Sequence, residues 1–163
     1  MVIKAARHLC WMAAIMSAAV AGPATGRAQG APGNCVGPPS NTWLTVAVNG
    51  VRSSSGLVAV TVYADDRSRF LVKRGSVCVM RVKAAEGETR ACVFLPGPGT
   101  WALAIYHDEN GNEQFDRSGL GLPREGYGFT NNPSTLAGLP NFGSVRLSVP
   151  KPGLLTRIRL KYP

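Results

Sequence analysis

Apolar residues recur at every second position along most of the chain beyond residue 42. Leu44, Val46 and Val48 alternate with smaller or polar residues, and the same period continues over residues 57–63. A period of two is typical of a β-strand with one buried face. The pattern predicts seven strands, over residues 44–51, 57–63, 77–83, 89–95, 100–106, 143–149 and 154–162.

Turn residues separate these segments at short intervals, and no segment has a convincing amphipathic helical period. The polar residues 52–56 and 84–88 predict hairpins between the strands on either side of them. Residues 64–75 are compatible with either a short helix or an irregular crossover. Seven short strands with frequent turns predict an all-β fold, an antiparallel sandwich of two sheets packed face to face.

The length of 163 residues favours one domain, and the 19 glycines and 12 prolines suit turns better than long helices. The first residues have the features of an export signal. Lys4 and Arg7 precede an apolar stretch over residues 9–20, which is short for a membrane span. Small residues then allow cleavage after residue 21 or residue 28. An uncleaved membrane anchor is the alternative.

The predicted organisation is a signal peptide over residues 1–28, a flexible lead-in over residues 29–41 and a sandwich domain over residues 42–163. The mature protein is expected to be periplasmic or secreted and to lack a transmembrane segment. Its basic last strand is interpreted as a solvated sheet face, with anionic envelope surfaces as the alternative partner. Nucleic acid is not expected as a partner of an exported chain without a recognised reading motif.

Three cysteines remain after the signal, and export to an oxidising compartment allows a disulfide. Counting outward from Ala85 places Cys78 directly opposite Cys92 in the predicted hairpin. Directly opposed residues of an antiparallel pair lie close enough to be bridged. We therefore predict a disulfide between Cys78 and Cys92, the alternative being two buried thiols, and leave Cys35 without an assigned partner.

A long segment, residues 106–133, connects the fifth and sixth predicted strands. A loop of this length in a compact domain is usually functional or disordered. The segment contains five of the nine acidic residues of a basic protein, namely Asp108, Glu109, Glu113, Asp116 and Glu125. Acids concentrated against the net charge of +9 indicate a local role.

The beginning of this loop has the spacing of a calcium site. Oxygen-bearing side chains occupy its first, third, fifth and ninth positions, and two further groups are candidate ligands: Asp108, Asn110, Asn112 and Asp116, with the main-chain carbonyl of Gln114 and the carboxylate of Glu125. The loop is not an EF-hand, because Gly119 occupies the twelfth position, where a bidentate glutamate is required. The pattern predicts either a weak Ca²⁺ site or an ion-free loop shaped by Asn and Asp hydrogen bonds.

His107 and Asp108, with Glu125 downstream, form a candidate catalytic set for a periplasmic hydrolase. No serine lies in a nucleophile-elbow pattern, and no set of residues fills every role of a catalytic site. A non-catalytic protein is therefore the preferred interpretation, and the hydrolase is the alternative. Tyr127 and Phe129 are expected either to cap the end of the sandwich or to form an exposed binding platform.

The loop carries a long motif, HDENGN followed by an aspartate and then by EGYGFTNN, and LPGPGTWALAIYHD leads into it. Through these residues the chain, from about residue 42 to residue 162, resembles the secreted bacterial family catalogued as domain of unknown function 2141. Thr130 stands where serine is commoner in that family, and Glu113 where a small residue is common. The resemblance implies an extracytoplasmic β-sandwich similar to immunoglobulin-like or transthyretin-like domains, without an established activity.

Together these predictions describe an exported, non-catalytic β-sandwich with a candidate calcium loop. Its expected role is that of a binding or structural module. Its expected partner is a protein or a glycan of the cell envelope.

Overall fold

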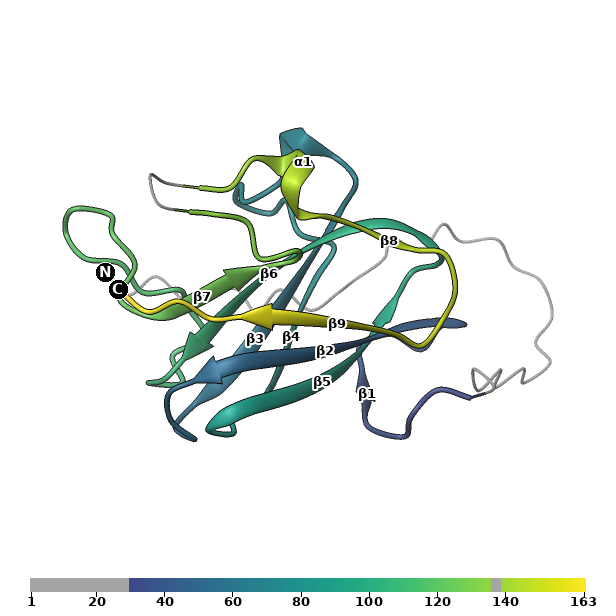
Figure 1. Cartoon of the computed structure of the whole chain (residues 1–163), viewed down its shortest axis with the longest axis horizontal. Helices are drawn as coiled ribbons and strands as arrows, with labels where there is room; N and C mark the ends of the chain where they lie inside the picture. Colours follow the sequence, from purple (N-terminus) through teal and green to yellow (C-terminus); the bar gives the residue numbers. More distant parts are fainter. Residues whose placement is uncertain (1–29, 136–138) are drawn as a thin grey trace, which may run out of the picture.

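The computed structural model describes residues 30–135 and 139–163 of the chain; the predicted signal peptide lies outside them. Nearly half of these residues belong to β-strands, which are arranged in two sheets (Figure 1). The strands are β1 (Cys35–Val36), β2 (Thr42–Val51), β3 (Leu57–Ala64), β4 (Cys78–Lys83), β5 (Gly87–Leu95), β6 (Gly99–Asp108), β7 (Gly126–Phe129), β8 (Arg146–Val149) and β9 (Leu154–Arg159). Two short helical segments complete the fold, a 3₁₀ turn (Arg67–Arg69) and the helix α1 (Phe142–Val145).

The first sheet has the strand order β1-β5-β2-β9, and the second has the order β4-β3-β6-β7, with β8 also paired to β6. The predicted all-β fold of two sheets is therefore confirmed. The expectation of purely antiparallel pairing is wrong, because β9 runs parallel to β2 and β1 runs parallel to β5. The arrowheads of β2 and β9 accordingly point the same way in Figure 1.

Both predicted hairpins are wrong for the same reason. The strand β2 lies in the first sheet and β3 in the second, so the turn between them crosses from one layer to the other. The strands β4 and β5 are separated in the same way, because β4 pairs with β3 and β5 pairs with β2. A period of two identifies the buried face of a strand but does not select its partner.

The core lies between the two sheets and consists of the inward side chains of both. It is built mainly of valine, leucine and isoleucine, for example Val46 and Ile158 from the first sheet and Val60, Leu103 and Ile105 from the second. These residues occupy alternate positions of their strands, as the sequence pattern predicts.

The segment predicted as a strand over residues 143–149 begins instead as α1, and only its second half is the strand β8. The carboxamide of Asn141 accepts a hydrogen bond from the backbone N–H of Gly143 at 2.9 Å, which caps the helix. Phe142 of α1 and Phe70, which follows the 3₁₀ turn, pack together with ring centroids 5.4 Å apart. They cover part of the outer face of the second sheet. No helix in the described ranges is long and apolar enough to cross a membrane.

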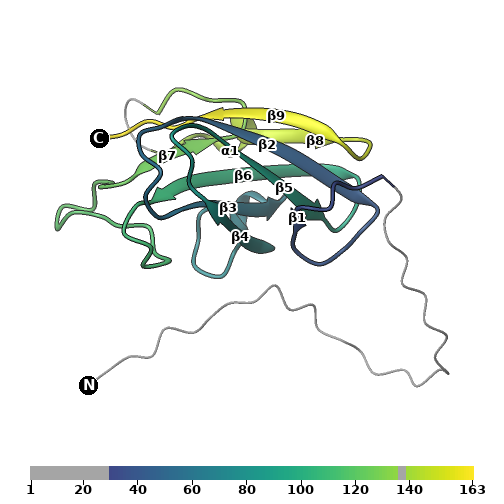
Figure 2. The same ribbon diagram turned by 90° about the horizontal axis from the view of Figure 1, so that it is seen from below.

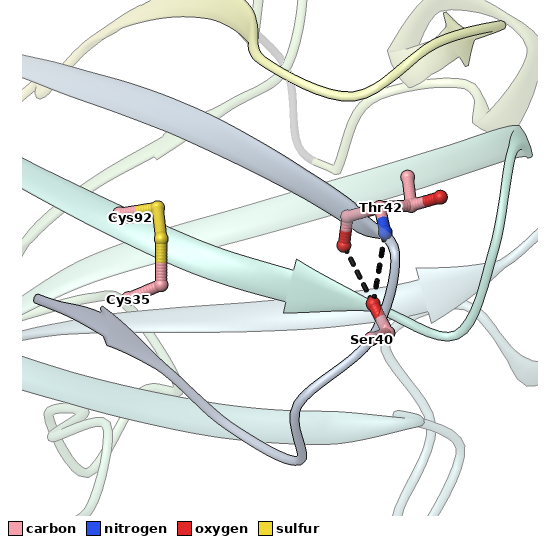
Figure 3. The surroundings of a disulfide bond; sticks show 4 residues. All are labelled: Cys35, Ser40, Thr42 and Cys92. Carbon is pink, nitrogen blue, oxygen red and sulfur yellow. Dashed lines mark hydrogen bonds between the residues drawn. A yellow bond between two sulfur atoms is a disulfide. The ribbon is translucent and has the colours of Figure 1, made fainter. Parts of the chain in front are cut away.

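The disulfide joins Cys35 to Cys92 and not Cys78 to Cys92 (Figure 3). The predicted pairing fails because the strands β4 and β5 belong to different sheets, and Cys78 faces the core while Cys92 points away from it. Cys78 is a buried thiol. The strand β1, part of the expected lead-in, is therefore fastened to β5 at the end of the molecule remote from the C-terminus (Figure 2). In the chain-entropy model, closing a loop with a sequence separation of 57 contributes about 4 kcal/mol.

The two sheets are also joined along one edge, where β7 approaches the chain that continues from β9. The backbone N–H of Tyr127 donates to the carbonyl of Lys161 at 2.9 Å, and the N–H of Lys161 donates back to the carbonyl of Tyr127 at 2.8 Å. The side chain of Asn132 extends this junction, because its Oδ1 accepts from the N–H of Arg159 at 2.7 Å. This seam holds the acidic loop, β7 and the C-terminal segment in a fixed arrangement.

Candidate functional site

His107 lies at the end of β6, has no exposed surface and has both ring nitrogens occupied. Its Nε2 lies 2.8 Å from the carbonyl oxygen of Ser55, and its Nδ1 lies 2.7 Å from the hydroxyl of Tyr162. A carbonyl can only accept, so Nε2 carries a proton, and the neutral tautomer can then accept from the Tyr162 hydroxyl at Nδ1. The Tyr162 oxygen itself accepts from the backbone N–H of Arg52 at 3.1 Å. His107 is thus a buried link between three segments of the chain.

The carboxylate of Asp108 faces the opposite way and organises the beginning of the loop. It is fully buried and accepts two backbone hydrogen bonds, from Asn112 N at 3.1 Å and from Glu113 N at 2.8 Å. The glycine at position 56 permits this arrangement, because a Cβ there would overlap the carbonyl oxygen of Asp108. Glu109, the next residue, is engaged separately by an ion pair with Arg52, which lowers the pKa of its carboxyl.

Asn110, Asn112 and Asp116 hold the loop together through their side chains. The Oδ1 atoms of Asn110 and Asn112 accept from backbone N–H groups two residues further on, at 3.0 and 2.8 Å. Their Nδ2 groups donate to the carboxylate of Asp116, at 2.8 Å from Asn110 and 3.1 Å from Asn112. Gln114 contributes its backbone N–H to Asn112. The predicted ligand residues therefore form a hydrogen-bonded network among themselves.

Glu125 closes this network from the far end of the loop, just before β7. Only 4 % of Glu125 is exposed, and its Oε2 accepts from the backbone N–H of Asp116 at 3.1 Å. Its Oε1 has no hydrogen-bond partner in residues 30–135 and 139–163. Burial raises the pKa of this carboxyl, and the charges of Asp108 and Asp116 raise it further, against the lowering effects of the backbone N–H groups of Asp116 and Glu109. Three predicted metal ligands are thus neighbours, and one of their oxygens is buried without a donor.

No group of three or more His, Cys, Asp or Glu side chains in residues 30–135 and 139–163 is arranged to hold a metal ion. The amide groups of Asn110 and Asn112 present nitrogen rather than oxygen to Asp116. A cation in this loop would require both amides to turn, so that oxygen replaces nitrogen beside the carboxylate. The calcium site stays a prediction.

A groove of about 660 Å³ lies beside the acidic loop, on the outer face of the second sheet. Its floor is formed by the outward side chains of three neighbouring strands: Thr61 and Tyr63 from β3, Ala104 and Tyr106 from β6, and Tyr127 and Phe129 from β7. One wall is the second half of the loop, with Phe115, Arg117 and Leu122. The opposite wall includes Leu71 and Leu139. Volumes of this order are common for ligand sites.

Aromatic rings form a continuous layer along this groove. The ring of Phe115 lies 5.5 Å from that of Tyr106 and 6.1 Å from that of Tyr127, and Tyr127 lies 6.0 Å from Phe129. Burial raises the pKa of the hydroxyls of Tyr63 and Tyr106, which keeps them protonated. The rim carries exposed apolar side chains, with Leu122 exposed to 61 % and Leu139 to 68 %. Large apolar side chains at the rim of an apolar cavity are typical of a binding surface.

A smaller cavity of about 360 Å³ lies on the other side of β7. Three residues line both cavities, namely Tyr127, Phe129 and Thr135. The smaller cavity is also lined by Asn132, Arg159 and Lys161, so its character is polar and basic. Neither cavity is lined by His107, Asp108 or Glu125.

The sequence patterns pointed to the loop but not to the groove. Phe129 is buried against Phe70, with ring centroids 6.3 Å apart, whereas Tyr127 is half-buried in the groove. Both rings nevertheless line the groove on the outer face of the second sheet. A signal for the groove was present in residues 101–106, which are apolar or aromatic on both faces of the strand. Such a strand is covered on both sides, so its outer face must meet further chain or a ligand.

The fold and its loop define a small two-sheet β-protein that carries a concave outer surface. The sequence model of one family, described as an uncharacterized protein conserved in bacteria (DUF2141), matches residues 46–154, and the chain belongs to this family. No curated protein and no solved structure matches the chain. Membership confirms the resemblance found in the loop motif. It assigns no activity, so function has to be argued from the site itself.

Proposed function

We propose that this protein is an exported, non-catalytic binding module that takes its ligand in the groove on the outer face of β3, β6 and β7. The observation that carries the proposal is the groove itself, about 660 Å³ with an aromatic floor. An apolar cavity with a few polar groups is the usual form of a small-molecule site. The export signal and the disulfide between Cys35 and Cys92 support an oxidising compartment, periplasmic or secreted.

The alternative of a hydrolase using His107, Asp108 and Glu125 has less support. The two nitrogens of His107 are bonded to Ser55 and Tyr162, so this imidazole would have to break a buried contact to act as a base. A catalytic base must reach a proton of the substrate, directly or through one water. None of the three residues lines either cavity. Binding is therefore the better account of the geometry.

Calcium is a second component of the proposal, and Glu125 favours it. Its buried Oε1 has no donor, and it lies close to the carboxylates of Asp108 and Asp116. A cation would neutralise these charges and satisfy that oxygen. Since Phe115 precedes Asp116 and forms part of the groove wall, a bound Ca²⁺ would also steady one side of the groove. The expected dissociation constant is on the order of 0.1–1 mM.

The binding proposal is tested with N-phenyl-1-naphthylamine, a neutral probe that becomes fluorescent in apolar sites. The mature protein should bind the probe saturably at one site. The variant Ala104→Phe places a ring in the groove floor and should weaken binding at least about tenfold. Its matched control is Ala85→Phe, in the exposed turn between β4 and β5. Absence of saturable binding by the native chain, or equal binding by Ala104→Phe, would sink the proposal.

The calcium component is tested separately by urea unfolding in EDTA, in 10 mM CaCl₂ and in 10 mM MgCl₂. For a dissociation constant near 1 mM, 10 mM calcium should raise the free energy of unfolding by about 1.4 kcal/mol. The rise should be absent in Asp116→Asn, whose side chain is partly exposed, so the fold should tolerate the change. An equal effect of both salts would indicate ionic strength alone and would remove calcium from the proposal.

A further inference from the structure

The chemistry of the groove's surroundings restricts the class of ligand. The larger cavity is lined by a single charged residue, Arg117, and the smaller by two, Arg159 and Lys161. Within the part of the chain that the structure describes, no aspartate or glutamate lines either one. Among the described residues, neither Arg159 nor Lys161 has a carboxylate within 4.0 Å. An apolar cavity therefore adjoins a basic one that holds two cations without anionic partners.

The two cavities are fixed relative to one another. The paired backbone hydrogen bonds between Tyr127 and Lys161 place the basic segment directly against the aromatic strand. The carboxamide of Asn132 holds Arg159 in the same way, through its backbone N–H. The side chains of Arg159 and Lys161 are exposed and face away from the core, as alternate residues of this segment do. A ligand that crosses β7 would meet rings first and cations second.

We propose, building on the binding function above, that the ligand is a single-chain amphiphile with an anionic head group. Its hydrocarbon chain lies in the aromatic groove. Its head group crosses the edge of β7 and lies between Arg159 and Lys161, within reach of the hydroxyl of Thr135 and the carboxamide of Asn132. Lys161 Nζ is already 3.4 Å from Thr135 Oγ1, so these polar groups converge.

The shape of the groove favours one free chain over a membrane surface. Its floor residues Thr61, Tyr63 and Phe129 are only 8, 7 and 6 % exposed. Leu122 and Leu139, which also line the groove, are far more exposed, at 61 and 68 %. A flat bilayer would touch the exposed rim and leave the floor uncovered, whereas a single chain can enter. Burial of a chain contributes about 0.8 kcal/mol per CH₂ group, so a chain of about ten carbons would bind measurably.

The test is displacement of N-phenyl-1-naphthylamine by three amphiphiles that share a ten-carbon chain, each below its critical micelle concentration. Decanoate is anionic, decyl glucoside is neutral and decyltrimethylammonium is cationic. Decanoate should displace the probe at a concentration about tenfold below decyl glucoside, and the cationic compound should be weakest. In Arg159→Gln/Lys161→Gln this preference should disappear while affinity for decyl glucoside is retained. The control Lys83→Gln/Lys151→Gln changes the net charge equally at exposed residues that line neither cavity.

The outcomes separate this inference from the function on which it rests. If the probe binds but the three amphiphiles compete equally or not at all, the groove is a binding site and the anionic amphiphile is wrong. If the control double variant loses the preference as well, the effect is one of net charge and the head-group site is wrong. If phosphatidylglycerol vesicles bind the native protein and Ala104→Phe alike while monomeric decanoate does not bind, the basic residues serve a membrane surface. If the probe itself does not bind, both proposals fail.

Discussion

The two faces of the strand β7 differ in how they are packed. Its inward positions, Gly126 and Gly128, have no side chain; Tyr162, after β9, packs against Gly126, and the end of β9 packs against Gly128. Its outward positions, Tyr127 and Phe129, carry rings that form part of the groove floor. The inner face is filled by close contact with neighbouring chain, and the outer face borders an open groove.

The difference explains why the family motif is dense in unusual residues. Gly128 is required by the carbonyl of Arg159, and Gly126 by the ring of Tyr162. Thr130, further along, accepts from the buried N–H of Leu103 at 3.2 Å and donates to the carbonyl of Val145. Gly126, Gly128 and Thr130 of the motif therefore serve the packing and hydrogen bonding of the fold, whereas Glu125 keeps one buried oxygen without a hydrogen bond among the described residues. Function is better sought on the opposite face.

The largest effect should come from filling the inner face. In Gly128→Ala the new Cβ would lie 2.6 Å from the carbonyl oxygen of Arg159, and this backbone atom cannot move without opening the seam. Overpacking of this kind should lower the free energy of unfolding by about 3 kcal/mol, measured by urea denaturation. Gly119→Ala is the matched control, because its Cβ would meet no atom within 4 Å. Similar stability of the two variants would show that the backbone of the seam can shift to accommodate the added methyl group.

A smaller loss should follow from removing the hydroxyl of the half-buried Tyr162. Tyr162→Phe keeps the ring beside Gly126 but deprives His107 Nδ1 and Arg52 N of their partner, at present 2.7 and 3.1 Å away. His107 is fully buried, so its unsatisfied Nδ1 should reduce stability by about 1–2 kcal/mol, whereas water can replace the hydroxyl at the exposed Arg52. Tyr127→Phe tests the outer face with the same change, since its hydroxyl has no hydrogen bond within the described ranges. That variant should unfold within about 0.5 kcal/mol of the native protein, and equal losses would contradict the contrast between the faces.

The sequence pattern predicted the strands and their buried faces, but not the pairing of the strands. Alternation identified the core strands, because burial of one face is a local property of each strand. Pairing was missed: Leu44 was expected beside the strand of residues 57–63, but its neighbours are Val93 and Leu154 from remote segments. A turn between two strands does not determine whether those strands pair with each other. The disulfide between Cys78 and Cys92 was predicted wrongly because it rested on such an assumed hairpin. The loop residues were found, whereas the groove was not, because its floor joins Thr61 to Ala104 across strands far apart in sequence.

An effect on binding without an effect on stability is expected at the rim. Leu122 lines the groove, whereas Leu120, which is 88 % exposed, does not. Leu122→Ser and Leu120→Ser should both unfold within about 0.5 kcal/mol of the native protein, because neither side chain is buried. Only Leu122→Ser should weaken probe binding, by about fivefold, as a lost apolar contact of about 1 kcal/mol requires. Equal probe affinities of the two variants would show that the ligand does not contact Leu122.

The smallest expected effect is a pH dependence of the free energy of unfolding, and it arises from Glu125 at the boundary between the loop and β7. Its carboxyl has a folded-state pKa above the usual 4.5, mainly because it is buried. The folded protein therefore binds a proton more tightly than the unfolded chain. The stabilisation by that proton is present below pH 4.5 and is lost as pH rises through the raised value.

Glu125→Gln keeps an oxygen for the Asp116 N–H and cannot ionise, so it should flatten this part of the pH profile of unfolding and leave probe affinity unchanged. Measurement of the free energy of unfolding between pH 4 and pH 8, in EDTA, decides the matter. The native curve should fall relative to the variant as pH rises, and parallel curves would show that the buried carboxylate is already compensated. Calcium should restore the native curve but not the variant's, because only an ionised Glu125 gives the cation a third carboxylate.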